Sequence, residues 1–164
     1  MKKYVIAVYV DNQFGVLTRV TGLFTRRGFN IDSLTVGVTE NPAYSRITIG
    51  VHGDERLKTQ MVAQLKKLHS VKKVEVLDEE ATKRELMLIK VKHTAGTRTE
   101  IMTAVDVFRA KVVDYSPSEM CVEVTGDSSK MDAFVALMEP FGIMEMCRTG
   151  IVALDRGSTT LLSK

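Results

Sequence analysis

The sequence is short of cysteine, with only two among its 164 residues. Cys121 and Cys147 do not form a CxxC pair and have no histidine neighbours, so the sequence does not predict a zinc site. In a cytosolic chain with this cysteine usage, two free thiols are favoured over a disulfide. The cysteines therefore carry little information about function.

Long apolar runs are also missing. Lys2, Lys3 and a short apolar run begin the chain, but charge resumes at Asp11, no small-residue cleavage site follows, and no later run reaches membrane-spanning length. We therefore expect a cytoplasmic protein, or one of the plastid stroma if the source were a plant, with no transit peptide in this chain.

No catalytic motif is present, because the sequence contains no P-loop, no GxGxxG and no HExxH. His52, His69 and His93 lie near predicted element ends, without cysteine, serine or carboxylate partners at a diagnostic spacing. We expect them to be exposed residues rather than bases or ligands. The sequence thus predicts no catalytic residue and no metal site.

Neither a basic stripe nor an aromatic platform indicates nucleic-acid binding. The 23 Lys and Arg residues are scattered among 20 acidic ones, giving a net charge of +3. A four-stranded sheet of the kind predicted below is also the RNA-recognition fold, but residues 46–53 lack the aromatic pair that stacks bases. Tyr4 and Tyr9 lie on the first predicted strand and do not supply that pair.

Hydrophobic periodicity predicts the same order of elements in each half of the chain: strand, helix, strand, strand, helix, strand. In the first half these elements occupy residues 4–10, 16–27, 29–39, 46–51, 55–68 and 71–77. In the second half they occupy residues 84–93, 100–108, 111–115, 119–125, a helix after Ser129, and 143–148. We therefore predict an α+β protein of two ferredoxin-like βαββαβ domains, 1–78 and 84–164, joined by a charged linker at 79–83.

The chain is organised around residues 11–31, where a predicted helix is bounded by Gly15 and Gly28. A helix start that follows a flexible glycine exposes backbone N–H groups and is a ready anion site. Asn12 and Asn30 flank this helix with side chains that both donate and accept hydrogen bonds. The stretch fits a small ligand with one carboxylate and one ammonium group, and it fits an empty turn equally well.

Both faces of two predicted strands are apolar. In the first strand, Val5 and Ala7 are apolar on one face, and in residues 86–91 both faces are apolar. A monomer would leave an apolar patch exposed at these positions. We therefore predict dimerisation through the sheets. The alternative is that the two halves pack on each other.

Several runs resemble one known family. They are DNQFGVLTRVTGLFTRRGFNIDSLTVG, SRITI, RELMLIKV, VFRAKVVDYSP, VTGD and FGIMEMCRTGIVALDRG. Together these runs are similar to the regulatory (small) subunits of acetohydroxyacid synthase, also called acetolactate synthase, which begin with an ACT domain. The RTG-containing run at residues 148–157 is characteristic of this family, since generic ACT domains lack it. The resemblance implies an N-terminal ACT domain and a C-terminal ACT-like domain.

The resemblance also implies a function. Members are non-catalytic subunits that bind a catalytic (large) subunit, raise its activity and confer feedback inhibition by valine in branched-chain amino acid biosynthesis. Thiamine diphosphate, Mg and FAD are then expected on the large subunit, and no cofactor on this chain. A stand-alone ACT-type amino-acid sensor and an enzyme are the alternative classes.

In this family the effector lies between two ACT domains of a homodimer, held by the turn before the first helix and by the start of the second strand. By position, the resemblance implies that valine is bound by Asn12, Gly15, Val16, Leu17, Asn30 and Ile31. Phe14 stands where relatives more often have a small residue or proline. The backbone amides after Gly15 would take the carboxylate, in agreement with the anion site expected from the residues themselves.

Overall fold

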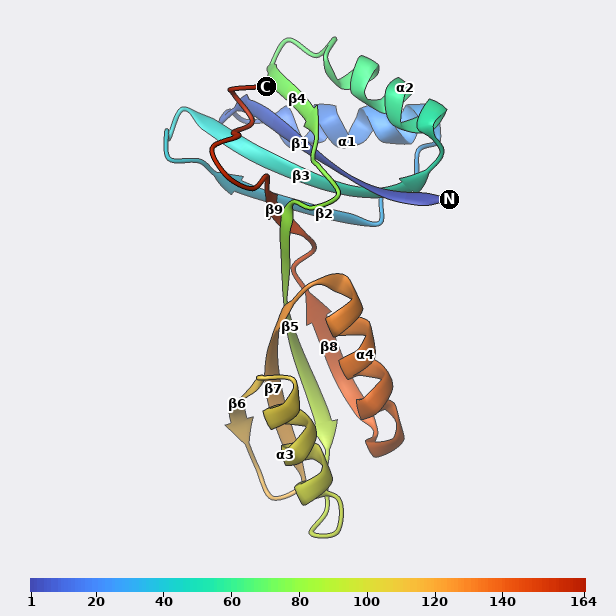
Figure 1. Cartoon of the computed structure of the whole chain (residues 1–164), viewed down its shortest axis with the longest axis vertical. Coiled ribbons are helices and arrows are strands. Elements are labelled where there is room, and N and C mark those ends of the chain that lie inside the picture. The colour runs from blue at the N-terminus through green and yellow to red at the C-terminus, as the bar shows by residue number, and fades with distance from the viewer. The chain divides into compact units, whose positions relative to one another are not determined.

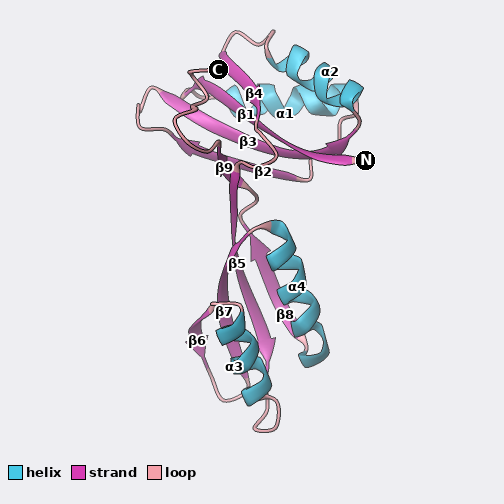
Figure 2. Ribbon diagram, viewed as in Figure 1, coloured by secondary structure: helices cyan, strands magenta, loops and turns pink.

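The structure, a computed structural model, describes all residues from Met1 to Lys164. The chain forms two compact units, one of residues 1–82 with 150–164 and the other of residues 83–149. Each unit has an antiparallel sheet with two helices on one face (Figures 1 and 2). This arrangement confirms the predicted α+β class and the ferredoxin-like order of elements. No helix is both long and apolar enough to cross a membrane.

The first unit has the sheet order β2-β3-β1-β4, so β2 and β4 are its edge strands. All neighbouring strands in this sheet run antiparallel. Its elements are β1 (Lys2–Asp11), α1 (Val16–Arg27), β2 (Ser33–Val38), β3 (Tyr44–Gly53), α2 (Glu55–Leu65), β4 (Val71–Val76) and, in the returning segment, β9 (Val152–Leu154).

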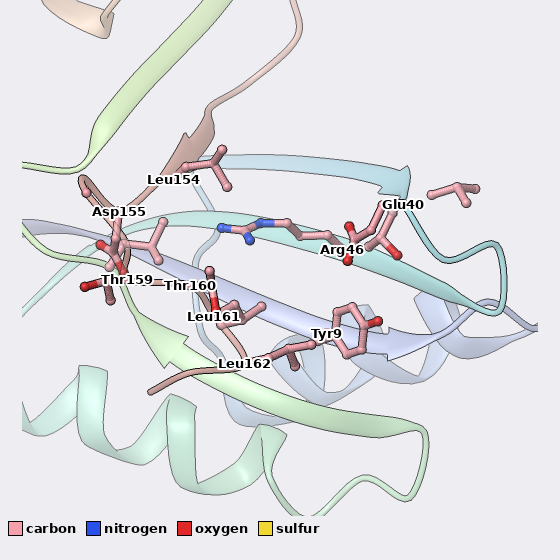
Figure 3. Close-up of a pocket in the computed structure, with 13 residues that line it drawn as sticks. Tyr9, Glu40, Arg46, Leu154, Asp155, Thr159, Thr160, Leu161 and Leu162 are labelled. Atoms are coloured by element: carbon pink, nitrogen blue, oxygen red, sulfur yellow. The ribbon is translucent and has the colours of Figure 1, made fainter.

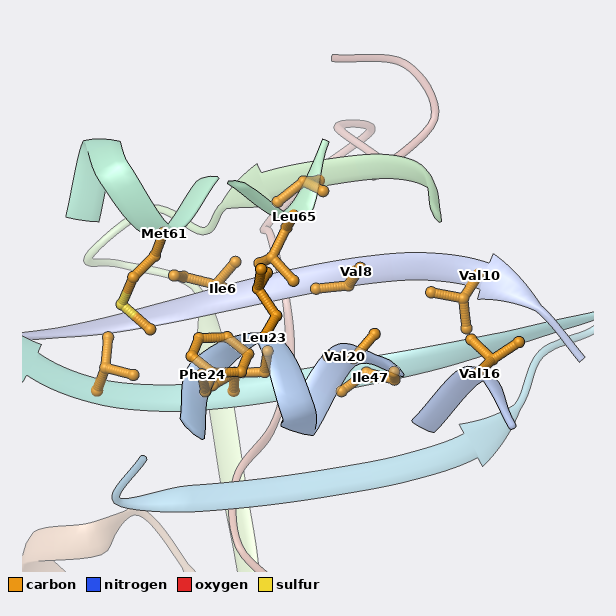
Figure 4. Packing of buried hydrophobic residues seen from close by; sticks show 13 residues of the cluster. Ile6, Val8, Val10, Val16, Val20, Leu23, Phe24, Ile47, Met61 and Leu65 are labelled. Carbon is orange, nitrogen blue, oxygen red and sulfur yellow. The ribbon is translucent and has the colours of Figure 1, made fainter. Parts of the chain in front are cut away.

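Alternation along the strands places the first core between the sheet and its two helices. Ile6, Val8 and Val10 of β1 point toward Val20 and Phe24 of α1, and all five side chains are buried (Figure 4). The helix repeat brings one face of α1 onto the period-two face of the strands, which is the packing that the sequence predicts. This core fixes the position of α1 and hence of both of its ends.

The opposite face of this sheet is covered by the chain's own C-terminal segment. Val5 and Ala7 of β1 are buried at 4% and 0% exposure in a second cluster that includes Ile151, Ala153 and Leu161. The expectation that this patch would be exposed in a monomer is therefore wrong for the first unit. Residues 150–164, predicted to belong to the second domain, pack instead with the first unit because they supply this apolar cover.

Polar contacts hold the returning segment on the sheet. Arg46 donates from Nη2 to the Ala153 carbonyl at 2.7 Å, and Arg156 donates from Nε to the Glu80 carbonyl at 2.6 Å. Asp155 accepts from the Asp78 N–H at 3.0 Å. These bonds give the segment a defined path over the apolar cluster.

The second unit repeats the order of the first, with its sheet path running β6-β7-β5-β8. Its elements are β5 (Thr82–Lys92), α3 (Arg98–Val107), β6 (Lys111–Tyr115), β7 (Glu119–Gly126), α4 (Ser128–Met138), the short 3-10 helix η1 (Glu139–Phe141) and β8 (Ile143–Arg148). Alternate residues of β5 and β7, among them Ile89 and Val122, form its core with Ile101 of α3 and Phe134 of α4.

One detail of the second unit differs from the sequence-based expectation and another agrees with it. The cap of α4 is Asp127, whose carboxylate accepts from the Lys130 N–H at 2.9 Å, so the helix begins before Ser129 and not after it. The sheet face away from the helices agrees with the expectation for residues 86–91, because the chain does not cover it as it does in the first unit. Leu86 and Leu88 there remain 37% exposed each.

Candidate functional site

The turn between β1 and α1 leaves the start of this helix open. Gly15 is the N-cap in a left-handed conformation (φ 83°, ψ −7°) and has no side chain with which to cap the helix. The first turn contains no acidic residue, and the N–H groups of Leu17 and Thr18 form no hydrogen bond within the chain. Unpaired amides at the positive end of a helix dipole form a site for an anion.

Apolar side chains stand beside these amides. Phe14 is fully exposed and Leu17 is 42% exposed, whereas Val16 is buried at 3% in the core. Val16 can therefore offer the site only backbone, while Leu17 offers both an amide and an apolar surface. The turn combines an anion site with an apolar rim.

Asn12 is fixed at the edge of this turn. Its side-chain Nδ2 donates to the Pro42 carbonyl at 2.9 Å, and its backbone N–H donates to the Ala43 carbonyl at 2.8 Å. One of the two side-chain N–H donors is thereby engaged, and the side-chain oxygen, which takes part in neither bond, is an acceptor suited to an ammonium.

Asn30 and Ile31 lie at the other end of α1. The helix spans twelve residues, or about 18 Å at 1.5 Å per residue. Strand register agrees, because Asp11 pairs with Tyr44 at the start of β3 whereas Ser33 pairs with Gly50 in its second half. Within one chain the structure therefore does not bring the six predicted site residues together. Asn30 is exposed, and Ile31 is half-buried against the core.

The histidines differ from one another. His52 is exposed, and its Nδ1 lies 2.6 Å from the Asp32 carboxylate. His93 is buried at 3% exposure, its Nε2 lies 2.8 Å from the Ser116 carbonyl, and its ring stacks on Tyr115. The expectation of an exposed residue is wrong for His93. The signal was present in the sequence, because His93 continues the buried alternation of β5.

Two family models match this chain over nearly its whole length. Residues 6–73 match the ACT domain of acetohydroxyacid synthase small subunits, and residues 84–157 match the small subunit of acetolactate synthase. The chain belongs to the acetolactate synthase small-subunit family.

Individual relatives agree with this assignment. A probable acetolactate synthase small subunit from Archaeoglobus fulgidus is 49% identical over 156 residues, covering 95% of this chain and 98% of the relative. The small subunit from Mycobacterium bovis is 47% identical, covering 95% and 94% of the two chains. The crystal structure of the Thermotoga maritima small subunit superposes with a TM-score of 0.89 at 39% identity, covering 97% of this chain and all of that one.

The RTG motif of this small subunit has a structural role. Arg148 bonds the buried Glu85 carboxylate from Nε and Nη2 at 3.0 and 2.9 Å, and Asp132 from Nη1 at 2.7 Å. Burial alone would lower the pKa of Arg148, but the Asp132 and Glu85 carboxylates outweigh it and raise that pKa. Gly150 adopts a φ of 82°, and a Cβ there would lie 2.9 Å from the Thr35 hydroxyl. The motif fastens the end of β8 and begins the returning segment.

The small subunit also has a cavity of about 520 Å³ on the sheet face opposite α1, which sequence reasoning missed (Figure 3). One wall comes from the strands of the sheet and the other from the returning segment 154–162. No local pattern could reveal it, because its walls lie far apart in the sequence.

Proposed function

We propose that this chain is the regulatory subunit of an acetolactate synthase. In this role it binds the catalytic large subunit, raises its activity and makes it sensitive to valine. The chain's membership of the small-subunit family supports the partner, and the open start of α1 supports a carboxylate-bearing effector. Thiamine diphosphate, Mg and FAD would reside on the large subunit, with no cofactor and no catalytic residue on this one.

The observation that carries the effector site is the uncapped start of α1. The valine carboxylate accepts hydrogen bonds from the Leu17 and Thr18 amides, where the helix dipole adds a favourable interaction. The Asn12 side-chain oxygen accepts from the ammonium, and Leu17 contacts the isopropyl group. This arrangement leaves Asn30 and Ile31 unused within the same chain.

A second copy of the chain completes the site. β2 is an edge strand of its sheet, and antiparallel pairing with the partner's β2 would continue the sheet across that edge. A two-fold axis at that edge sets the two α1 helices side by side and antiparallel, so the start of one lies beside the end of the other. Asn30 and Ile31 of the partner's chain then face Gly15. The homodimer is thus proposed through the edge of the sheet and not through the covered face.

Regulation follows as a population shift. Valine bound across the two copies favours one arrangement of the paired domains, and the large subunit senses that arrangement through other surfaces. The coupling equals the difference in valine affinity between the arrangements, so inhibition requires that valine prefers the less active one.

The test mixes the purified chain with a thiamine-dependent large subunit and measures acetolactate formation with and without valine. We expect stimulation over the large subunit alone, and reversal of that stimulation by valine. Failure to form a complex would favour a stand-alone sensor, and stimulation insensitive to valine would contradict the effector site alone.

A further inference from the structure

The cavity on the covered sheet face has the features of a small-molecule site. Its volume of about 520 Å³ falls within the range of about 300 to 1,000 Å³ that ligand pockets occupy. Most of the wall's exposed area is apolar, although six polar or charged residues also line the cavity: Thr39, Glu40, Arg46, Asp155, Thr159 and Thr160. The apolar contribution comes from Tyr9, Val38, Leu77, Leu154, Leu161 and Leu162.

Arg46 is the cation in this cavity. Figure 3 shows its side chain extended across the space, with the guanidinium on the side of Leu154 and Asp155. One nitrogen donates to the Ala153 carbonyl at 2.7 Å, which leaves most of the five guanidinium N–H donors for another acceptor. Burial lowers the pKa of Arg46, although Asp155 and Glu40 act in the opposite direction.

The nearby carboxylates do not form an ion pair with Arg46. Asp155 is engaged by the Lys164 ammonium at 2.6 Å and by the Asp78 N–H at 3.0 Å. Burial alone raises the pKa of Asp155, but those two partners outweigh it and hold that pKa below its usual value. The cavity therefore contains a guanidinium with free donors. Of the two carboxylates that line it, Asp155 is engaged by other partners and Glu40 is exposed to solvent.

We propose that this cavity binds a small aliphatic carboxylate. The carboxylate accepts two hydrogen bonds from Arg46, the pairing for which the guanidinium fork is shaped. The alkyl body lies among Leu154, Leu161 and Tyr9. This site lies on the opposite face of the sheet from α1, so it is separate from the proposed valine site and does not depend on it.

The returning segment forms one wall, so binding is coupled to the segment's position. A ligand that bonds Arg46 and contacts Leu161 holds residues 154–162 against the sheet, and the site is lost when the segment leaves. Occupancy should therefore stabilise the segment by mass action.

Methyl NMR of the full chain tests the proposal with isovalerate as the probe. We expect saturable shifts of the Leu154 and Leu161 methyl signals, with the Leu17 methyls, which report on the proposed valine site, unchanged. Isovaleramide has the same shape without the charge and should bind at least tenfold more weakly. Equal binding of the amide, or shifts confined to Leu17, would overturn the proposal.

The matched variants are Arg46→Gln and Arg27→Gln. Arg27 is an exposed arginine of α1 that bonds Gln64 at 3.2 Å, so it controls for the loss of one positive charge. Isovalerate affinity should fall about ten- to a hundredfold in Arg46→Gln and stay unchanged in Arg27→Gln. Equal affinity in all three proteins would contradict the site.

A third variant guards against unfolding of the returning segment in Arg46→Gln. Thr159 is exposed and lines the cavity, so Thr159→Phe fills space while leaving the Arg46 bond in place. Binding of isovalerate should be lost in this variant while its urea unfolding matches that of the unaltered protein. Retained binding would overturn the assignment, and tighter binding of valine than of isovalerate would overturn the ligand class.

Discussion

The two units share one topology but begin their first helices differently. In the second unit the Thr94 N–H donates to the Thr97 hydroxyl at 2.9 Å, and the Thr97 N–H lies 3.3 Å from the Thr94 hydroxyl. Side chains thus occupy the turn before α3. In the first unit Gly15 occupies the same place and leaves the Leu17 and Thr18 amides open. The Thr99 and Glu100 amides at the start of α3 form no hydrogen bond within the chain either, so what sets the two helix starts apart is the acidic Glu100 in the first turn of α3, which disfavours an anion there.

The outer sheet faces differ as well. In the first unit Val5 and Ala7 are buried beneath the returning segment, whereas Leu86 and Leu88 at comparable positions of the second unit are 37% exposed. Equal apolar patterns on β1 and β5 thus end in different environments. The difference arises from where residues 150–164 pack and not from the strands themselves.

The largest expected effect comes from closing the open turn. Gly15→Asp places a carboxylate where Asp54 caps α2, so it competes for the α1 amides and repels the ligand carboxylate. Valine affinity should fall more than about a hundredfold, because hydrogen bonds to a charged group contribute about 1.5 to 3 kcal/mol each. Calorimetry measures the affinity, and stimulation of the large subunit should persist.

Gly157→Asp is the control for backbone strain at this position. Gly157 has a similar left-handed conformation (φ 69°), and a Cβ there has open space around it. This variant should leave valine affinity unchanged. Unaltered valine binding in Gly15→Asp would show that the effector lies elsewhere.

The second effect tests the two outer faces. Ile151→Ala removes a side chain of the returning segment that is 3% exposed and packs with Val5 and Ala7 of the sheet, and it should destabilise the first unit by about 2 to 5 kcal/mol. Leu88→Ala, at an exposed position of the second unit, should cost less than about 0.5 kcal/mol. Urea unfolding of both variants measures the contrast. Equal losses would contradict the covered face.

The pattern of β1 shows what sequence could and could not predict. Local pattern predicted the strand that carries Ile6 and Val8 and the glycines at both ends of α1, because these depend on neighbours a few residues away. The cover over Val5 and Ala7 could not be predicted, since Ile151 comes from a distant segment with no local signal of its destination. The cavity beside Arg46 was missed for the same reason. The distance between Gly15 and Asn30 within one chain is set by the length of α1, which lies between them.

The third effect concerns the far end of α1. If Asn30 of a partner chain bonds a charged group of valine, Asn30→Ala should reduce affinity about ten- to a hundredfold, equivalent to about 1.5 to 3 kcal/mol. Gln60→Ala, an exposed amide on α2, is the matched control and should change nothing. Because the proposed site spans two copies, the affinity of the unaltered protein should also fall on dilution below its dimerisation constant. A dissociation constant unaffected by Asn30→Ala would remove this residue from the site.

The smallest expected effect is the loss of stability on removing a side-chain cap, the feature that the start of α1 lacks. Asp127→Ala removes the cap of α4 and should cost about 1 kcal/mol at neutral pH. The hydrogen bond from the Lys130 backbone lowers the pKa of Asp127 below its ordinary value, with Ser129 contributing next. A lowered pKa in the folded state means that the cap stabilises the protein above the ordinary pKa of an aspartate and loses this effect as the pH falls through the lowered pKa. The two proteins should therefore differ in urea unfolding at pH 7 and converge in acid. A stability difference that is the same at both pH values would show that the charge of Asp127 plays no part, and that anions gain little at helix starts in this fold, including the open start of α1.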